Sequence, residues 1–249
     1  MIGNLLYKNC IFIQKYSIGY IILSINKRST ILEYCFKKTD MDYVNSKAKV
    51  VIVGITPGNE QIKKSRKDKT KKEIKMDNAF AGKMRKPLIE MLNYIQLNKY
   101  LGIKTCESLW EKDFNKIEFT SLLKEATYEY KMVNGKREEK MFNDPSKILK
   151  VQKLKNAFEK GFKADCKKSK DAKLFIALGR VSNILKLLQD EGLINCDIIT
   201  IPHPTGQNSG RIKVFLGRSD NMRDSSYINA SEMAKRSRNT IRRLIKEEQ

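Results

Sequence analysis

The run Val50-Val51-Ile52-Val53, continued by Gly54-Ile55-Thr56-Pro57-Gly58, decides the fold. An unbroken β-branched run is typical of a strand buried on both faces of a parallel sheet, so Ala48–Val53 is expected to be one. Ile198–Ile201 is a second apolar run, in an expected strand Asp197–Ile201, and it leads into Pro202-His203-Pro204-Thr205-Gly206. Loops at the carboxyl ends of parallel strands form the binding crevice of an open sheet. The two loops, one carrying the sole histidine, therefore predict a shared active site.

The remaining apolar patterns alternate between strand and helix along the chain. Further strands are expected at Lys116–Leu123 and Ala172–Leu178, and further helices at Met84–Gln96, Ile148–Phe162, Val181–Leu188 and Ser231–Lys246. Tyr128–Asn143 is expected to be a hairpin or excursion, and the lysine-rich Gln61–Lys75 and the polar Gly206–Tyr227 to be loops. This alternation predicts a three-layer α/β/α fold around a short, mainly parallel, four-stranded sheet.

Composition suits one soluble domain with a polyanionic partner. The chain has 249 residues, 41% hydrophobic and 31% charged, and its net charge of +22 favours nucleic acid. A single domain is expected over residues 41–249. Residues 1–40 are expected to be an extension without chemistry, upstream of the true start if translation begins at Met41. Lys8 and Lys15 interrupt the apolar Ile2–Ile25 stretch, so no membrane span is expected.

Five scattered cysteines argue against a metal site, an iron–sulfur cluster and a disulfide framework. Cys10, Cys35, Cys106, Cys166 and Cys196 form no Cys-x-x-Cys pair, and there is one histidine. We therefore expect no metal and no cofactor. Free cysteines fit a reducing compartment, so a cytoplasmic location is expected.

Between Lys49 and Lys213, four motifs in order resemble those of the uracil-DNA glycosylase superfamily. Gly54-Ile55-Thr56-Pro57-Gly58 resembles its first motif, G-x-x-P-G, and His203-Pro204-Thr205 resembles its H-P-S motif. Ala79-Phe80-Ala81-Gly82 resembles the segment that carries its base-stacking phenylalanine, and Thr120-Ser121 stands where it has a Thr-Asn pair. The resemblance implies that fold and a monofunctional DNA glycosylase that flips a base and leaves an abasic site.

The departures from the family pattern bear on the substrate and the water. Thr56 stands where several branches have a water-positioning Asp or Asn, and Ile55 where others have Glu. Ser121 replaces the base-reading Asn. Serine is smaller and both donates and accepts, so the pocket is expected to admit something other than plain uracil.

The resemblance and local chemistry together nominate site residues. His203 is expected to donate to the leaving base, whereas Thr56, Asn59 and Glu60 are candidates for handling the water. The expected base contacts are Ile55, Pro57, Gly58, Phe80 and Ser121. The expected DNA contacts are Lys63, Lys64, Gln207, Asn208, Arg211 and Lys213, with Gln207, Asn208, Arg211 or Ile212 as the wedge.

The leading hypothesis is a DNA glycosylase for a modified pyrimidine, such as a decorated cytosine of phage DNA, acting in antiviral defence. One alternative is a uracil-excising enzyme of base-excision repair, and another is a non-catalytic nucleic-acid-binding protein on the same fold. A nucleotide-binding enzyme is disfavoured because the first loop lacks both phosphate-binding glycine patterns. The expected partner is DNA, and the chain is expected to be a monomer.

Overall fold

The computed structural model describes residues 33–62, 69–133, 136–220 and 224–249. The strands are β1 (Glu33–Lys37), β2 (Val50–Gly54), β3 (Ile117–Ser121), β4 (Ala126–Val133), β5 (Lys136–Met141), β6 (Leu174–Leu178) and β7 (Asp197–Ile201). The α-helices are α1 (Asn59–Ile62), α2 (Lys71–Asn78), α3 (Arg85–Tyr94), α4 (Leu97–Tyr100), α5 (Gln152–Phe158), α6 (Ala164–Cys166), α7 (Val181–Asp190), α8 (Ser209–Phe215) and α9 (Ser225–Glu247).

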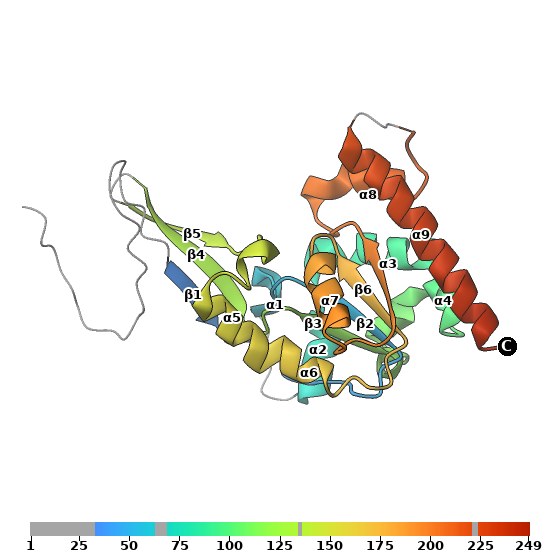
Figure 1. The fold of residues 1–249 in the computed structure, drawn as a ribbon, viewed down its shortest axis with the longest axis horizontal. Helices are drawn as coiled ribbons and strands as arrows, with labels where there is room; N and C mark the ends of the chain where they lie inside the picture. Colours follow the sequence, from blue (N-terminus) through green and yellow to red (C-terminus); the bar gives the residue numbers. More distant parts are fainter. Residues whose placement is uncertain (1–32, 63–68, 134–135, 221–223) are drawn as a thin grey trace, which may run out of the picture.

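A four-stranded parallel sheet in the order β3-β2-β6-β7 forms the centre of the molecule (Figure 1). The central strands β2 and β6 are buried along their whole length, as their continuous apolar runs predict. In chain order the strands run 2-1-3-4, so the winding reverses between β2 and β6. In sheets of this kind, ligands bind in the crevice at the carboxyl ends beside that reversal.

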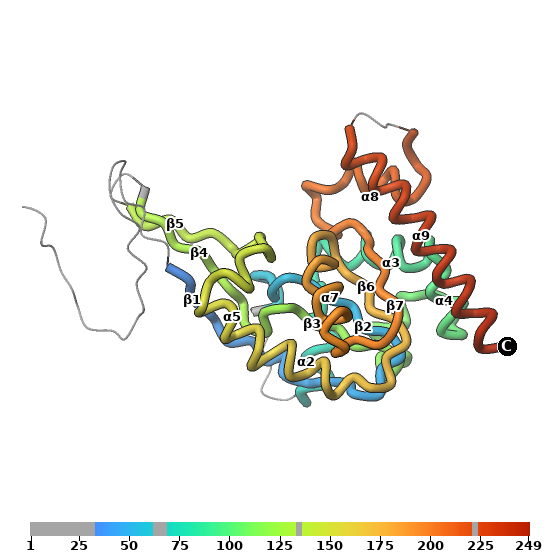
Figure 2. The backbone as a smooth tube through the Cα atoms, in the orientation of Figure 1, coloured from blue at the N-terminus to red at the C-terminus, as the bar shows by residue number. Residues whose placement is uncertain are grey.

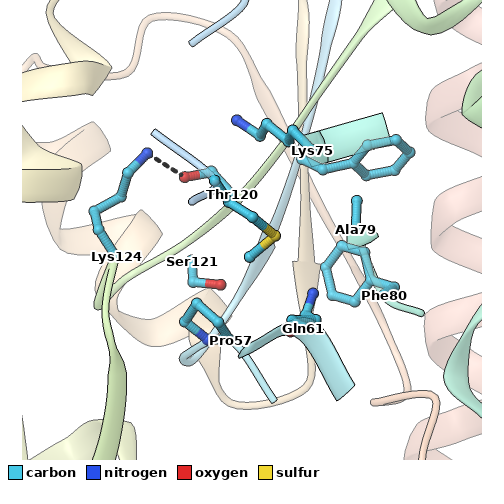
Figure 3. A pocket seen from close by; sticks show the side chains of 10 residues that line it. Pro57, Gln61, Lys75, Ala79, Phe80, Thr120, Ser121 and Lys124 are labelled. Atoms are coloured by element: carbon cyan, nitrogen blue, oxygen red, sulfur yellow. Dashed lines mark hydrogen bonds between the residues drawn. The ribbon is translucent and has the colours of Figure 1, made fainter. Parts of the chain in front are cut away.

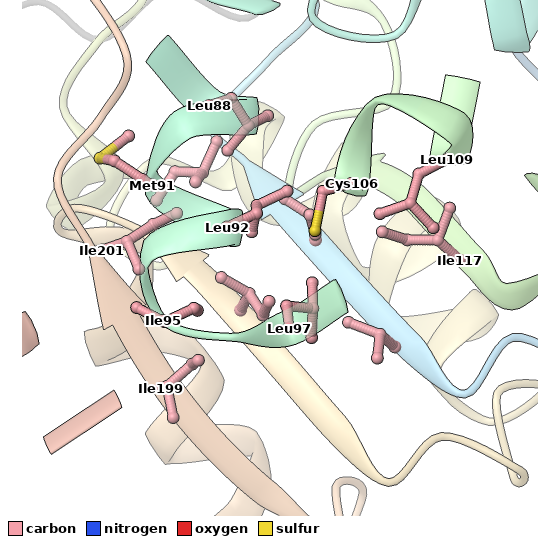
Figure 4. Close-up of a cluster of buried hydrophobic side chains, with 14 of the residues drawn as sticks. Leu88, Met91, Leu92, Ile95, Leu97, Cys106, Leu109, Ile117, Ile199 and Ile201 are labelled. Carbon is pink, nitrogen blue, oxygen red and sulfur yellow. The ribbon is translucent and has the colours of Figure 1, made fainter. Parts of the chain in front are cut away.

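Alternate side chains of the strands enter two separate cores, which confirms the three-layer prediction. Val50 and Ile52 pack on one face with α3, α4, α8 and α9, and Figure 4 shows part of this cluster. Val51 and Val53 pack on the other face with α5 and α7. The period of two along each strand therefore covers the sheet with helices on both faces.

A second sheet, antiparallel and three-stranded, has the order β1-β4-β5 and extends to one side of the body (Figures 1 and 2). Its β4–β5 hairpin confirms the expectation at Tyr128–Asn143. β1 pairs with β4 from Glu33↔Tyr130 to Lys37↔Ala126, so this part of the segment before Met41 is hydrogen-bonded to the body.

Two predicted loops are wrong in part. Gly206–Tyr227 contains a 3₁₀ turn and α8, because Ile212, Val214 and Phe215 supply a buried apolar face. Gln61–Lys75 includes the start of α2, where Thr70 and Glu73 form a reciprocal capping box. The predicted Ile148–Phe162 helix begins only at Gln152 and continues as a π-helical turn over Glu159–Lys163.

Candidate active site

A pocket opens at the carboxyl ends of β2 and β3 (Figure 3). Its lining residues are Met41, Pro57, Gln61, Lys75, Ala79, Phe80, Phe119, Thr120, Ser121 and Lys124. The enclosed volume is about 20 Å³, close to the space that one water molecule needs. A planar base therefore enters only if side chains at the mouth move aside. Pro57, Phe80 and Ser121, three of the predicted base-contacting residues, meet here.

Phe80 reaches this pocket from a left-handed backbone conformation. Its φ is 50°, which is uncommon for a bulky residue and is found at sites where the surroundings hold it. The ring is 6% exposed and packs edge-on against Phe119 at 5.9 Å between centroids. Phe80 Cε1 also lies 3.4 Å from where a Cβ on Gly54 would be, so the ring stands directly over the end of β2.

Trp110 and Arg85 hold the segment that carries Phe80. Trp110 Nε1 donates to the Ala79 carbonyl oxygen at 2.7 Å, and its ring stacks on Phe119 at 4.5 Å. The Arg85 guanidinium donates to the same carbonyl at 3.1 Å and to the Asp77 carbonyl. The strained turn is thus fixed by tertiary hydrogen bonds rather than by local propensity.

The predicted water-handling residues sit in different environments. The Thr56 hydroxyl donates to the Glu125 carbonyl at 2.8 Å and accepts from the Thr127 amide at 3.0 Å. It therefore ties the first-motif loop to the start of β4. Asn59 is exposed, and its Oδ1 accepts from the Tyr128 hydroxyl at 2.6 Å. Glu60 is exposed and its side chain lies beside Gly82.

Two pocket residues, Gln61 and Lys75, were missed as site residues because both belong to the lysine-rich segment that was expected to be a loop. Gln61 is 7% exposed and accepts a hydrogen bond from the Gly58 amide. Lys75 is 2% exposed and pairs with buried Glu118. The capping box at Thr70 is the sequence signal that could have placed Lys75 on a helix.

Lys75 is an ammonium group held inside the protein by two acceptors. It donates to the Glu118 carboxylate and to the Tyr43 carbonyl oxygen. The other Glu118 oxygen accepts from the Asn45 amide at 2.8 Å. Burial lowers the pKa of Lys75 to about 8, although Glu118 favours the charged form.

His203 lies at the same edge of the sheet but two strands from the first motif. It does not line the pocket described above. Between β2 and β7 stands β6, which is followed by Gly179, and a Cβ on Gly179 would lie 3.7 Å from His203 Cβ. Two strand spacings separate the two loops by roughly 10 Å. Burial lowers the pKa of His203 below its ordinary value, so the imidazole is neutral at pH 7.

The segment after His203 is ordered by its own side chains. Asn208 Nδ2 donates to the His203 carbonyl at 3.0 Å and to Thr205 Oγ1 at 3.1 Å. Arg211 donates to Asn208 Oδ1 at 3.2 Å and to Ser226 Oγ at 3.1 Å. Asn208 and Arg211 thus support the loop that carries the histidine.

The other predicted DNA contacts divide by exposure. Gln207 and Lys213 are exposed on this rim. Ile212 is 7% exposed and belongs to the core, so the expectation that it could be the wedge is wrong for this conformation. Lys63 and Lys64 lie outside the described residues.

Within the described ranges, no group of three or more His, Cys, Asp or Glu side chains is placed to hold a metal ion. No helix among these residues combines the length and the apolar character that a membrane crossing requires.

Comparison with known proteins gives distant similarities. No family model matches the chain. It is 24% identical over 190 residues to the uncharacterized protein YoxB of Bacillus subtilis (strain 168), covering 70% of this chain and 71% of that protein. It is also similar to the crystal structure of wild-type Pedobacter heparinus SMUG2, with a TM-score of 0.40 and 11% identity over 80% of this chain and 76% of that one. At these levels, a function has to be argued from the residues of the site.

Proposed function

We propose that this protein is a DNA glycosylase, which flips a base out of DNA and hydrolyses its N-glycosidic bond to leave an abasic site. The observation that carries the proposal is the pocket between the Gly54–Gly58 loop, Ser121 and Phe80. Its aromatic wall is held in a strained conformation at the edge of the sheet where open α/β proteins bind ligands. The net charge of +22 supports a DNA partner.

Base flipping exposes the face of a nucleobase, and Phe80 offers the stacking surface. Unstacking and unpairing cost a few kcal/mol, which aromatic stacking and cationic contacts to the backbone offset. Gln207, Arg211 and Lys213 on the rim, with Lys63 and Lys64, are the proposed DNA contacts. Asn208 orders the rim segment from within. The loop residues Ile55, Pro57 and Gly58 are proposed to contact the base from the β2 side of the pocket.

His203 is the proposed electrophilic group. Cleavage leaves positive charge on the sugar and negative charge on the departing base. A neutral imidazole can donate one hydrogen bond to a carbonyl oxygen of that base, and such donors contribute about 3 kcal/mol. Water adds to the sugar C1′, and the base leaves with the bonding electrons and acquires a proton. Asn59 and Glu60 remain proposed for the water, together with Thr56 through its remaining lone pair.

A modified pyrimidine is the proposed substrate, with a decorated cytosine of phage DNA, and hence antiviral defence, as its leading form. Plain uracil, and hence base-excision repair, is the alternative. The test uses matched DNAs containing uracil, cytosine, hydroxymethylcytosine or glucosylated hydroxymethylcytosine, followed by alkali. Strand breaks confined to modified-cytosine DNA support the defence role, whereas breaks in uracil DNA support repair. Intact strands throughout contradict these substrates.

A non-catalytic DNA-binding protein is the second candidate. One observation favours it: the Thr56 hydroxyl, at the position of the family's water-holding residue, is engaged by two backbone groups. Wild-type protein that binds all four DNAs tightly and breaks none would select this candidate.

A further inference from the structure

The orientation of the Gln61 side-chain amide is determined by chemistry. Gln61 faces the Gly58 backbone N–H at 2.5 Å, and a backbone N–H can only donate. The atom that faces it must therefore be the oxygen, Oε1, and the nitrogen, Nε2, must take the other direction. Figure 3 shows that nitrogen directed into the pocket, between Phe80 and Pro57.

The pocket has a buried wall and a less buried mouth. Met41, Thr120, Ser121 and Lys124 are half-buried, whereas the rest of the lining is buried. Gln61 and Lys75 are the polar side chains of the buried wall. Lys75 is already bound to Glu118 and the Tyr43 carbonyl. Among the residues that the structure describes, no acceptor pairs with the Gln61 Nε2, so a side chain that is only 7% exposed directs an unused donor into the pocket.

We infer that Gln61 determines specificity: its Nε2 donates a hydrogen bond to the substituent at position 4 of the flipped pyrimidine. This inference rests on the proposed glycosylase function. The sugar is attached at N1, which stays near the mouth, and C4 lies opposite N1 in the ring. Position 4 therefore enters deepest and meets the buried wall.

A fixed donor there distinguishes two chemical classes. A carbonyl at position 4, as in uracil and 5-substituted uracils, accepts the hydrogen bond. An amino group, as in cytosine and its derivatives, places N–H against N–H and leaves two buried donors unpaired. Ser121 cannot supply this choice, because a hydroxyl both donates and accepts. Among modified pyrimidines, Gln61 thus favours a 5-substituted uracil over a decorated cytosine, and the inference therefore replaces the decorated cytosine as the leading form of the proposed substrate.

Gln61 is poorly suited to activating the water instead. An amide nitrogen has no lone pair available to accept a proton, and Oε1 is already bound to Gly58. The pocket-facing group therefore acts on binding and alignment of the base.

Gln61→Glu tests the inference with almost no change in shape. The carboxylate keeps an oxygen for the Gly58 N–H but turns the pocket-facing donor into an acceptor. The matched substrates are DNAs containing 5-hydroxymethyluracil or 5-hydroxymethylcytosine, which share the 5-substituent and differ in the position 4 group and, with it, in whether N3 carries a hydrogen. Wild-type protein is expected to prefer the carbonyl base, and Gln61→Glu to shift the ratio by about tenfold or more towards the amino base. Gln61→Met, which has neither group, should bring the ratio towards one.

Gln152→Glu is the control, because it makes the same chemical change at an exposed position on α5 and should leave the ratio as in wild type. Affinities for the same two bases as 2′-fluoro analogues, which resist cleavage, give a readout independent of catalysis. If Gln61→Glu inverts the ratio of the two affinities but no base is excised, the specificity role of Gln61 is supported and the proposed reaction is contradicted. If bases are excised but Gln61→Glu leaves the preference between the two bases unchanged, or weakens both equally, the specificity role of Gln61 is overturned. The proposed reaction would still stand.

Discussion

The two halves of the sheet's carboxyl edge are built differently. On the β2–β3 side, Phe80 and Gln61 enclose a pocket whose strained and buried groups are held by tertiary contacts. On the β6–β7 side, His203 lies next to Gly179, and hydrogen bonds of Asn208 and Arg211 order the segment that follows it. We propose that the first half recognises the base, with the Phe80 ring as its stacking surface and the Gln61 amide as its donor. The second offers the one imidazole of the chain.

The reversal of winding between β2 and β6 lies between these halves. A bound nucleotide would occupy the crevice there, with its base on the β2–β3 side and its glycosidic bond towards β7. The two loops stand roughly 10 Å apart, and we propose that the base and its sugar together lie between them. Changes in one half should therefore affect recognition, and changes in the other half should affect the chemical step.

The largest effect is expected from breaking the buried ion pair on the recognition side. Lys75→Met leaves the Glu118 carboxylate buried without its partner, so the free energy of unfolding should fall by about 3–5 kcal/mol. Denaturant unfolding measures this loss. Lys75→Met/Glu118→Met removes both charges and should recover most of the stability. A single variant as stable as wild type would show that the pair does not hold this half together.

His203→Ala should separate chemistry from binding. The rate of base excision should fall by about 10²–10³-fold, because a donor to the developing negative charge is removed. DNA affinity should change little, because the imidazole is not among the proposed backbone contacts. Single-turnover kinetics and equilibrium binding measure the two quantities. Equal losses in both would assign His203 to binding and remove the distinction between the halves.

Phe80→Ala should act in the opposite way, on recognition. Loss of aromatic stacking is expected to weaken the binding of DNA that contains the target base by about 1–3 kcal/mol. Binding to undamaged duplex should be nearly unchanged, and Phe80→Tyr, which keeps a ring, should retain the preference. Competition binding between the two DNAs measures this difference. A uniform loss on both DNAs would place Phe80 in the core alone.

The smallest effect concerns pH. Burial lowers the pKa of folded His203, so the folded state takes up this proton less readily than the unfolded state. Its contribution to stability is full above the unfolded value and is lost as pH falls through the lower folded value. His203→Gln has no group that titrates there and should lose less stability between pH 7 and pH 5. Because the chain has one histidine, the difference between the two melting curves isolates it. Parallel curves would contradict burial of the imidazole.

The sequence predicted what local patterns determine. Continuous apolar runs located β2, β6 and β7, and the carboxyl ends of β2 and β7 located the Thr56 and His203 loops. The motifs also pointed to Phe80 and Ser121, which do line one pocket. Lys75 was missed because the burial of a polar side chain depends on partners distant in sequence, such as Glu118. Gln61 was missed because the pocket it faces is completed by distant segments, such as those of Phe80 and Ser121. The helix α8 was not predicted because its short apolar face, which includes Ile212 and Phe215, lies within a mostly polar stretch of sequence.

Mass spectrometry of a single-turnover reaction tests the central claim most directly. Excess protein is incubated with DNA carrying 5-hydroxymethyluracil, 5-hydroxymethylcytosine, glucosylated 5-hydroxymethylcytosine or uracil at one position, in parallel with His203→Ala. Wild-type protein should release an intact free pyrimidine and leave an unbroken strand that has lost the base and gained one water, whereas His203→Ala should release almost none. If the strand mass is unchanged for every DNA although the protein–DNA complex has formed, the glycosylase proposal is contradicted. The protein would then be a non-catalytic DNA-binding protein.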